Sequence, residues 1–262
     1  MSNDSIAEKD AIVLLGLLAN ASVRFDKQFT HIDGVLTHTK GLNIFACIVD
    51  NNDGEVLGFG RNEIHTFYNP LLHAEQNALH KSIARINKKN RIDKNRMSVE
   101  RYYRNEMFNS ENPDDFGATL YTTLEPCPFC TSALLVSRMS RIVYLLPDEV
   151  YGNSFELLKS KYYNEYFINY ELLKFPDIGI NNLINSAKGQ YLKLLKKVER
   201  IKEDNPKISE TMLLDYLENE LLENKQVFQN INADALISKG DEKKRNLRTL
   251  TDLKELVKNY NG

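Results

Sequence analysis

The sequence predicts an α/β fold, in which helices pack on the faces of a β-sheet. Helical and extended patterns alternate between about residues 10 and 150, in the order helix, two strands, helix, strand, helix, strand. The chain has 262 residues, of which 42% are hydrophobic, and this is enough for a large core. Its net charge of −2 excludes a global positive field, so any binding to nucleic acid requires a local patch.

Each element of this pattern has its own sequence signal. Ile12, Leu15 and Ala19 recur at helical spacing and predict a helix within the first 25 residues. Two β-rich runs, 42–49 and 55–60, flank an Asn/Asp/Gly cluster and predict a hairpin. The later elements are a helix that begins near residue 72, a strand over 118–123, a helix that begins at the Pro-Cys-Pro segment 126–128, and a strand over 141–146.

The cysteine content and the N-terminal charge indicate the compartment. Three cysteines do not make a disulfide framework in a chain of this length, and two of them have the C-x-x-C spacing that is typical of metal or redox sites. The apolar run 11–19 is too short to span a bilayer, and acidic residues precede it, unlike in a signal peptide. We therefore expect a cytoplasmic protein that has no membrane partner.

Four residues carry the chemistry: His73, Glu75, Cys127 and Cys130. One imidazole and two thiolates supply three ligands for Zn²⁺ and leave the fourth tetrahedral position open, since Cys47 lies in an apolar run and is interpreted as core. Zinc lowers the pKa of a water at such a position to about 7. Glu75, two residues after His73, can point into the same cavity and carry protons. A closed structural zinc site is the alternative interpretation.

The motifs H-A-E at 73–75 and P-C-P-F-C at 126–130 together resemble the zinc-dependent cytidine, deoxycytidylate and tRNA-adenosine deaminase superfamily. The resemblance covers about residues 40–150. It implies a three-layer α/β/α fold with a mixed central sheet, and hydrolytic deamination at C4 of cytosine or C6 of adenine with release of ammonia. It also implies roles for individual residues: His73, Cys127 and Cys130 as ligands of Zn²⁺, Glu75 as the proton carrier, and Asn62 and Ala74 as substrate contacts.

The two halves of the motif resemble different branches of this superfamily. The stretch Y-T-T-L-E-P-C-P-F-C at 121–130 is most similar to tRNA adenosine and guanine deaminases, whereas H-A-E-Q-N-A at 73–78 is more similar to deoxycytidylate deaminases. The base therefore stays open. So does the size of the substrate, which is a nucleoside, a nucleotide or a single-stranded nucleic acid.

The chain departs from compact members of the superfamily in two places. His73 and Cys127 are 54 positions apart, and the extra segment, about 81–115, holds nine basic residues between 81 and 104. We interpret this insertion as a solvated helix extension and loop, with a lip that contacts phosphates or a lid that selects nucleotides as alternatives. We expect residues 1–158 to form the deaminase domain and residues 159–262 to form a helical extension of unknown role. This extension has two apolar stripes, which are Leu214, Leu217 and Leu221 and then Leu250, Leu253 and Val257.

A second hypothesis places the chain in a different class of protein. It would be a catalytically silent, zinc-stabilised interaction subunit that acts through its helical extension, in a homo-oligomer or with a helical partner. The presence of Glu75 argues against this hypothesis, because a silent subunit has no chemical use for that carboxylate.

Overall fold

The computed structural model describes residues 3–21, 29–32, 35–38, 44–64, 69–92, 117–139, 141–148, 151–162, 169–172, 200–201, 203–204, 225–226 and 228–259. Within these segments, no helix combines the length and the apolar character needed to cross a bilayer. The apolar stripe predicted at 214–221 and most of the predicted insertion lie outside the described residues. The cytoplasmic location stays a prediction.

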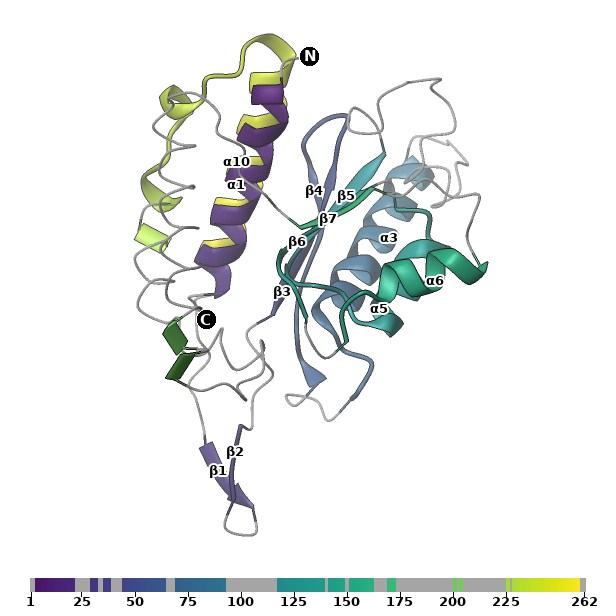
Figure 1. Cartoon of the computed structure of the whole chain (residues 1–262). Helices are drawn as coiled ribbons and strands as arrows, with labels where there is room; N and C mark the ends of the chain where they lie inside the picture. The colour runs from purple at the N-terminus through teal and green to yellow at the C-terminus, as the bar shows by residue number, and fades with distance from the viewer. Residues whose placement is uncertain are drawn as a thin grey trace.

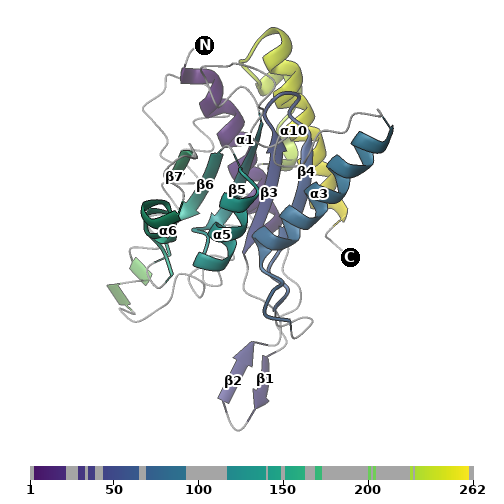
Figure 2. The same cartoon turned by 90° about the vertical axis from the view of Figure 1, so that its right-hand side faces the viewer.

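A five-stranded mixed sheet forms the centre of the molecule, in the order β4-β3-β5-β6-β7. The predicted hairpin is formed by β3 and β4, β5 runs antiparallel to β3, and β6 and β7 continue the sheet in parallel. A separate pair, β1 and β2, projects from one end of the molecule (Figures 1 and 2). The strands are β1 (Phe29–Ile32), β2 (Val35–His38), β3 (Phe45–Asp50), β4 (Val56–Arg61), β5 (Ala118–Leu124), β6 (Arg141–Leu146) and β7 (Asn169–Leu172).

Helices cover both faces of this sheet, and the three-layer α/β/α fold predicted above is confirmed (Figures 1 and 2). Helices α1 and α10 lie side by side on one face, and α3, α5 and α6 lie on the other. The short 3-10 turn η1 (Ala233–Ala235) precedes α10. The helices are α1 (Asn3–Ala21), α3 (Ala74–Ile92), α5 (Pro128–Val136), α6 (Ser154–Tyr162) and α10 (Gly240–Asn259).

The core fills the space on both sides of the two central strands. Every residue of β3 and β5 is buried, so helices cover both faces of these two central strands. From one side the core receives the α1 residues that were predicted by their helical spacing, and the predicted stripe of α10 is buried beside them. That stripe consists of Leu250, Leu253 and Val257.

The segment that leads into α10 is held to α1 by a buried carboxylate. Glu8 accepts hydrogen bonds from the backbone nitrogens of Ile237 at 2.6 Å and Ser238 at 3.3 Å, and from Nδ2 of Asn246 at 2.8 Å. These donors replace the water that Glu8 loses on burial. An acidic residue near the N-terminus therefore anchors a segment more than 200 positions away.

A second buried carboxylate, Glu55, joins the turn between β3 and β4 to two helices. Its side chain pairs with Arg85 and Lys89 of α3 and with Arg248 of α10. Arg85 and Lys89 are two of the nine basic residues of the predicted insertion. At 12 and 16 residues beyond His73, they lie roughly 18 and 24 Å from it along the axis of α3, given a rise of about 1.5 Å per residue. The described part of the insertion thus continues α3 away from His73.

Strand β7 and helix α10 lie beyond residue 158, where the sequence predicts the domain to end. Strand β7 pairs with β6 as the edge of the sheet, and α10 packs against α1. The boundary at 158 stays a prediction, and so does a separate role for residues 159–262. These two elements belong to the layers of the central sheet.

A buried ion pair links α1 to β6. Arg141 donates hydrogen bonds from both Nη atoms to the two carboxylate oxygens of Asp10, each at 2.9 Å, and the hydroxyl of Tyr121 donates to the same carboxylate at 2.7 Å. Both charged side chains are almost completely buried. We therefore expect Arg141→Met to lower the free energy of unfolding by about 3–5 kcal/mol, because it leaves Asp10 buried without its cation. Urea unfolding followed by circular dichroism measures this loss.

The matched control for this prediction is Lys244→Met. It removes the cation of a solvent-exposed pair with Asp241, whose atoms are 2.7 Å apart, and should leave the unfolding midpoint unchanged. Equal losses in the two variants would contradict a structural role for the buried pair.

Candidate metal centre and active site

The start of α3 is positioned by backbone contact with β4. Gly58 and Gly60 face this helix, and a Cβ on either would overlap a helix carbonyl oxygen, that of Ala78 or Ala74 respectively. The helix can approach the strand this closely because both positions lack a side chain. The backbone nitrogen of Glu63 donates to the carbonyl of Leu72 at 2.9 Å, which holds the residue before His73 against the end of β4.

The two cysteines are positioned by the loop between β5 and α5. Cys127 is the N-cap of α5 in an extended conformation, and Pro128 occupies the first turn, as the sequence predicts. Cys130 lies in the same turn, where the backbone nitrogen of Thr131 donates to the carbonyl of Cys127 at 2.8 Å. Because the N-terminus of a helix presents free N–H groups and a positive dipole end, this location favours the thiolate forms.

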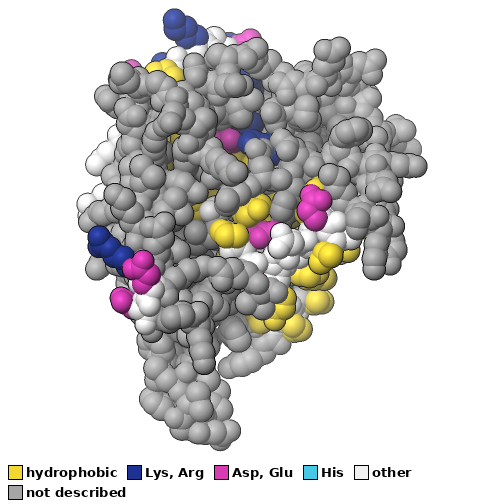
Figure 3. All heavy atoms as spheres, viewed as in Figure 1, with side chains coloured by type: hydrophobic (Ala, Val, Ile, Leu, Met, Phe, Trp, Pro, Cys, Tyr) yellow, Lys and Arg dark blue, Asp and Glu magenta, His cyan; other side chains and the backbone are white. Residues whose placement is uncertain are grey.

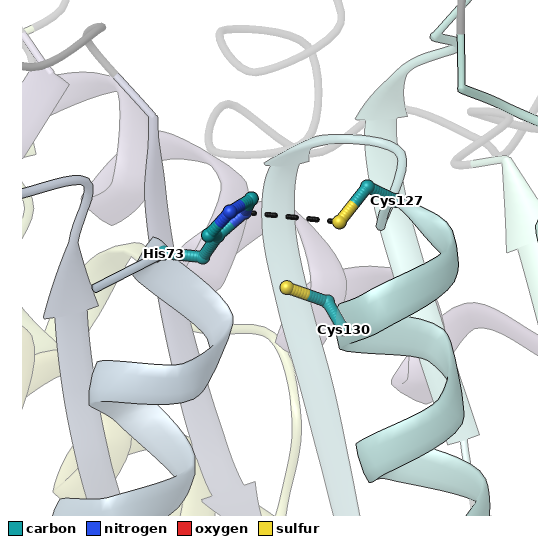
Figure 4. A group of neighbouring side chains, drawn as sticks. All are labelled: His73, Cys127 and Cys130. Atoms are coloured by element: carbon teal, nitrogen blue, oxygen red, sulfur yellow. Dashed lines mark hydrogen bonds between the residues drawn. The ribbon is translucent and has the colours of Figure 1, made fainter. Parts of the chain in front are cut away.

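The structure brings His73, Cys127 and Cys130 together (Figure 4). Their ligand atoms all lie within 4.8 Å of one another, and Cys127 Sγ is 3.7 Å from His73 Nδ1. In a tetrahedral zinc site with a Zn–N bond of about 2.05 Å and a Zn–S bond of about 2.3 Å, the nitrogen and sulfur would be about 3.6 Å apart. The donors and their spacing therefore fit Zn²⁺.

The two thiols differ in acidity because they interact with each other. The neighbouring Cys130 thiol, assisted by His73, lowers the pKa of Cys127 to about 4. The same interaction with Cys127, together with burial, raises the pKa of Cys130. Cys127 is therefore the thiol that ionises first, and Cys130 is the one that needs a metal to lose its proton.

Glu75 lies beside the cluster in the first turn of α3. The Cys130 thiol donates to its Oε2 at 3.5 Å, and the carboxylate is buried. Burial raises the pKa of Glu75 to about 7. A carboxyl group with a pKa near neutrality can both accept and release a proton under physiological conditions, which is what a proton carrier requires.

The other residues predicted from the sequence lie around this cluster or apart from it. Asn62 directly follows β4 and is buried, and its Oδ1 accepts a hydrogen bond from the backbone nitrogen of Ile64 at 3.1 Å. Ala74 is the first residue of α3 and is buried. Cys47 is buried in β3 opposite Tyr121 and is outside the cluster. The catalytic, metal-binding and substrate-binding roles assigned to these positions stay proposals.

Sequence reasoning missed Glu125, the residue before the Pro126-Cys127 segment. Glu125 is buried, and its carboxylate accepts hydrogen bonds from the backbone nitrogens of Asp148 at 3.1 Å and Asn153 at 2.9 Å. It ties the cysteine loop to the segment that leads into α6. A glutamate between an apolar strand and a proline was the available signal, but its partners are contributed by a later segment.

Phe129, between the two cysteines, was also not predicted as a site residue. Its ring lies edge-on to the His73 imidazole, with centroids 5.7 Å apart, and the residue is 44% exposed. Hydrophobic side chains reach the surface over α5 and α6 (Figure 3), and Val136, Tyr151 and Leu157 are among the exposed ones. An aromatic ring is therefore accessible at the edge of the cluster.

Comparison with known proteins relates this site to one family. Residues 35–146 match the cytidine and deoxycytidylate deaminase zinc-binding region, and this stretch contains all four residues of the predicted motif. The match to a zinc-binding region supports Zn²⁺ as the cofactor, and His73, Cys127 and Cys130 are its candidate ligands.

Two curated relatives of this chain are named for different substrates. The chain is 27% identical over 100 residues to a tRNA-specific adenosine deaminase of Aquifex aeolicus. These residues make up 38% of this chain and 50% of the relative. It is 31% identical over 103 residues to a cytosine deaminase of Candida albicans. These residues make up 39% of this chain and 51% of the relative. The chain thus spans about half the length of these relatives.

Solved structures of deaminases are also similar to this chain. One comes from a study of A-to-I editing by tRNA:A34 deaminases, with 22% identity, a TM-score of 0.35, and coverage of 50% of this chain and 82% of that chain. Another is a dCMP deaminase from the cyanophage S-TIM5, with 21% identity, a TM-score of 0.28, and coverage of 49% and 80%.

The contact between α3 and β4 predicts the effect of Gly60→Ala. The added methyl group would force the start of α3 away from the strand, and we expect a loss of about 1–3 kcal/mol in the free energy of unfolding and weaker zinc binding. Thermal unfolding and chelator competition measure the two effects. In the control variant Gly16→Ala the new Cβ meets the end of the flexible Leu253 side chain at 2.8 Å, so zinc affinity should be unchanged. Wild-type zinc affinity in Gly60→Ala would contradict the prediction.

Proposed function

We propose that this chain, whose residues 35–146 match the cytidine and deoxycytidylate deaminase zinc-binding region, is a zinc-dependent hydrolase that removes the exocyclic amine of a nucleobase. The net reaction converts the ring C–NH₂ group and one water into a carbonyl and ammonia. The observation that carries the proposal is the buried Glu75 carboxyl beside the His73, Cys127 and Cys130 donors. A purely structural metal site has no use for that group.

The residues of the chain divide the work of this reaction. His73, Cys127 and Cys130 would hold Zn²⁺, which when bound activates water for attack on the amine-bearing carbon. Glu75 would take a proton from the water, deliver it to the ring nitrogen, and assist the departure of ammonia. The pKa of about 7 for its carboxyl group supports both directions of transfer at neutral pH.

Three other residues would orient the base. Asn62, at the end of β4, and Ala74, at the start of α3, would contact the substrate as the resemblance implies. The exposed ring of Phe129 would form an apolar wall for a flat base next to His73.

The substrate class is a cytosine-type or adenine-type base in a nucleoside, a nucleotide or a nucleic acid. Relatives named for tRNA adenosine and for cytosine both match, which supports the coarse class and leaves the base open. Arg85 and Lys89 pair with Glu55, so these two residues of the insertion support a structural role more than a phosphate contact. Assembly into a homo-oligomer or with a helical partner stays a prediction.

Substitution of Glu75 tests the proposed chemistry. We expect Glu75→Gln to keep the zinc and to lower the turnover number by about 10²–10⁴-fold, because it removes the proton carrier and little else. The measurement is ammonia release by zinc-loaded protein from cytosine, cytidine, deoxycytidine, dCMP, dCTP, adenosine, guanine, single-stranded DNA and tRNA. Glu156→Gln, on the exposed surface of α6, is the matched control and should retain wild-type activity.

The outcome of this panel also decides between the two functional classes. Turnover of any substrate that disappears in Glu75→Gln supports the deaminase. If wild-type protein holds one zinc per chain and releases no ammonia from any of these compounds, the interaction subunit becomes the better hypothesis.

Substitution of Phe129 tests the proposed wall of the base site. Since stacking of a base on an aromatic side chain contributes about 1–3 kcal/mol, Phe129→Ala should lower kcat/KM by roughly 5–150-fold, mainly through KM. Steady-state kinetics on the preferred substrate measures this change. Val136→Ala, at another exposed apolar position of α5, should leave kcat/KM unchanged. Equal kinetics in the two variants would remove Phe129 from the site.

A further inference from the structure

The segment that follows β4 is fixed by hydrogen bonds around Asn62. The backbone nitrogen of Asn62 donates to the carbonyl of Ile44 at 3.0 Å, and that of Glu63 donates to the carbonyl of Leu72 at 2.9 Å. The side-chain oxygen of Asn62 accepts from the backbone nitrogen of Ile64 at 3.1 Å. Because this oxygen is engaged within its own turn, the amide nitrogen is the end of the Asn62 carboxamide that can donate to a ligand.

The side chain of Asn77 joins the two residues on either side of Asn62. Asn77 lies one helical turn beyond His73 in α3 and is 8% exposed. Its Nδ2 donates to the backbone carbonyl of Arg61 at 2.9 Å and to Oε2 of Glu63 at 3.1 Å. Since a carboxamide nitrogen has two hydrogens, these two bonds use both of them and fix the orientation of the side chain.

The carboxylate of Glu63 completes this arrangement. Its second oxygen, Oε1, accepts a hydrogen bond from Nε of Arg61 at 2.8 Å, and both side chains are about one-fifth exposed. Hydrogen bonds to an ionised group are roughly twice as strong as neutral ones, so the bonds of Glu63 hold well in this partly buried place. The backbone at Asn62 is therefore tied to α3, the helix whose start carries His73 and Glu75.

We propose that Asn77 is a positioning residue for Asn62. By holding the residues on both sides of Asn62, it sets the place of the Asn62 carboxamide relative to the start of α3, so that the amide nitrogen donates to an acceptor atom of the substrate. This inference rests on the proposed function, in which Asn62 contacts the substrate. It deepens that function, because it assigns the residue that sets this contact and identifies the contacted group as a hydrogen-bond acceptor.

The first test is Asn77→Asp, which keeps the size of the side chain, removes both donors and places a carboxylate beside Glu63. KM should rise by about 5–30-fold, the value of one well-made hydrogen bond to the substrate, with little change in kcat. Zinc affinity should stay at the wild-type value, because the backbone bond from Asn77 to the carbonyl of His73, at 3.0 Å, is kept. Asn230→Asp, the same exchange at an exposed position, should change none of these quantities.

A double-mutant cycle with Asn62→Ala separates positioning from a general structural role. Asn62→Ala should raise KM at least as much as Asn77→Asp. The combined variant should have the KM of Asn62→Ala alone, because a chain without the Asn62 carboxamide has nothing left for Asn77 to position. If the two increases multiply instead, Asn77 acts on the substrate site independently of Asn62, and the proposal is wrong.

A measurement that does not depend on activity follows the Asn62 carboxamide directly. Its two N–H signals in the proton–nitrogen NMR spectrum are assigned by their absence in Asn62→Ala. They should move in Asn77→Asp and stay in place in Asn230→Asp. In the pair Asn77→Asp with Glu63→Gln, the amide introduced at position 63 can donate to the carboxylate introduced at position 77. We therefore expect the signals to return toward their wild-type positions in this pair.

Unmoved Asn62 signals in Asn77→Asp would overturn the proposal, and so would a loss of zinc affinity in parallel with the rise in KM. If Asn77→Asp does not fold, Glu63→Ala at a partly exposed position removes one of the two acceptors and should move the same signals. Failure of the deaminase function gives a different result, in which wild-type protein binds zinc and releases no ammonia while the Asn62 signals still respond to Asn77→Asp.

Discussion

The close approach of α3 to β4 is the constraint on which the rest of the site depends. The helix lies so near the strand that Gly58 and Gly60 leave no room for a Cβ against the carbonyls of Ala78 and Ala74. This contact fixes both the distance of the helix from the sheet and the height at which the helix begins. His73 and Glu75 lie at that first turn, so a methyl group added to either glycine would move the imidazole and the carboxyl group together.

The site is built from two helix N-termini that lie next to each other on one face of the sheet (Figure 4). One supplies the imidazole and Glu75, and the other supplies both sulfurs, so neither helix alone provides the three metal donors. Burial then brings several acidic groups into one small volume. Interactions between Cys127, Cys130 and Glu75 separate their pKa values, and a divalent cation is the natural compensation for the negative charge that results. The affinity for a cation thus follows from the close placement of these acidic groups in the fold.

The opposite face of the sheet is held by buried acidic groups with a different task. Asp10 pairs with Arg141 and Glu8 holds the segment before α10. Glu55, in the turn between β3 and β4, joins α10 on this face to α3 on the other. These carboxylates act as anchors, since each is matched by cations or by hydrogen-bond donors. Helix α10 is consequently part of the layer that supports β3 and β5, although it lies more than 100 residues beyond the last cysteine of the metal centre. The catalytic face and the anchoring face share the same central strands.

The sequence by itself determined the α/β class, the hairpin, the proline-led helix and the four residues of the motif, because these depend on periodicity and on spacing along the chain. It also indicated that Cys47 belongs to the core, from the apolar run around it. Only the tertiary structure decided that Gly58 and Gly60 set the start of α3 and that Glu125 holds the cysteine loop. It likewise placed β7 and α10 in the layers of the central sheet. The physical reason is that the partners of these groups come from distant segments of the chain. A pattern within one segment does not indicate which distant group will pack against that segment.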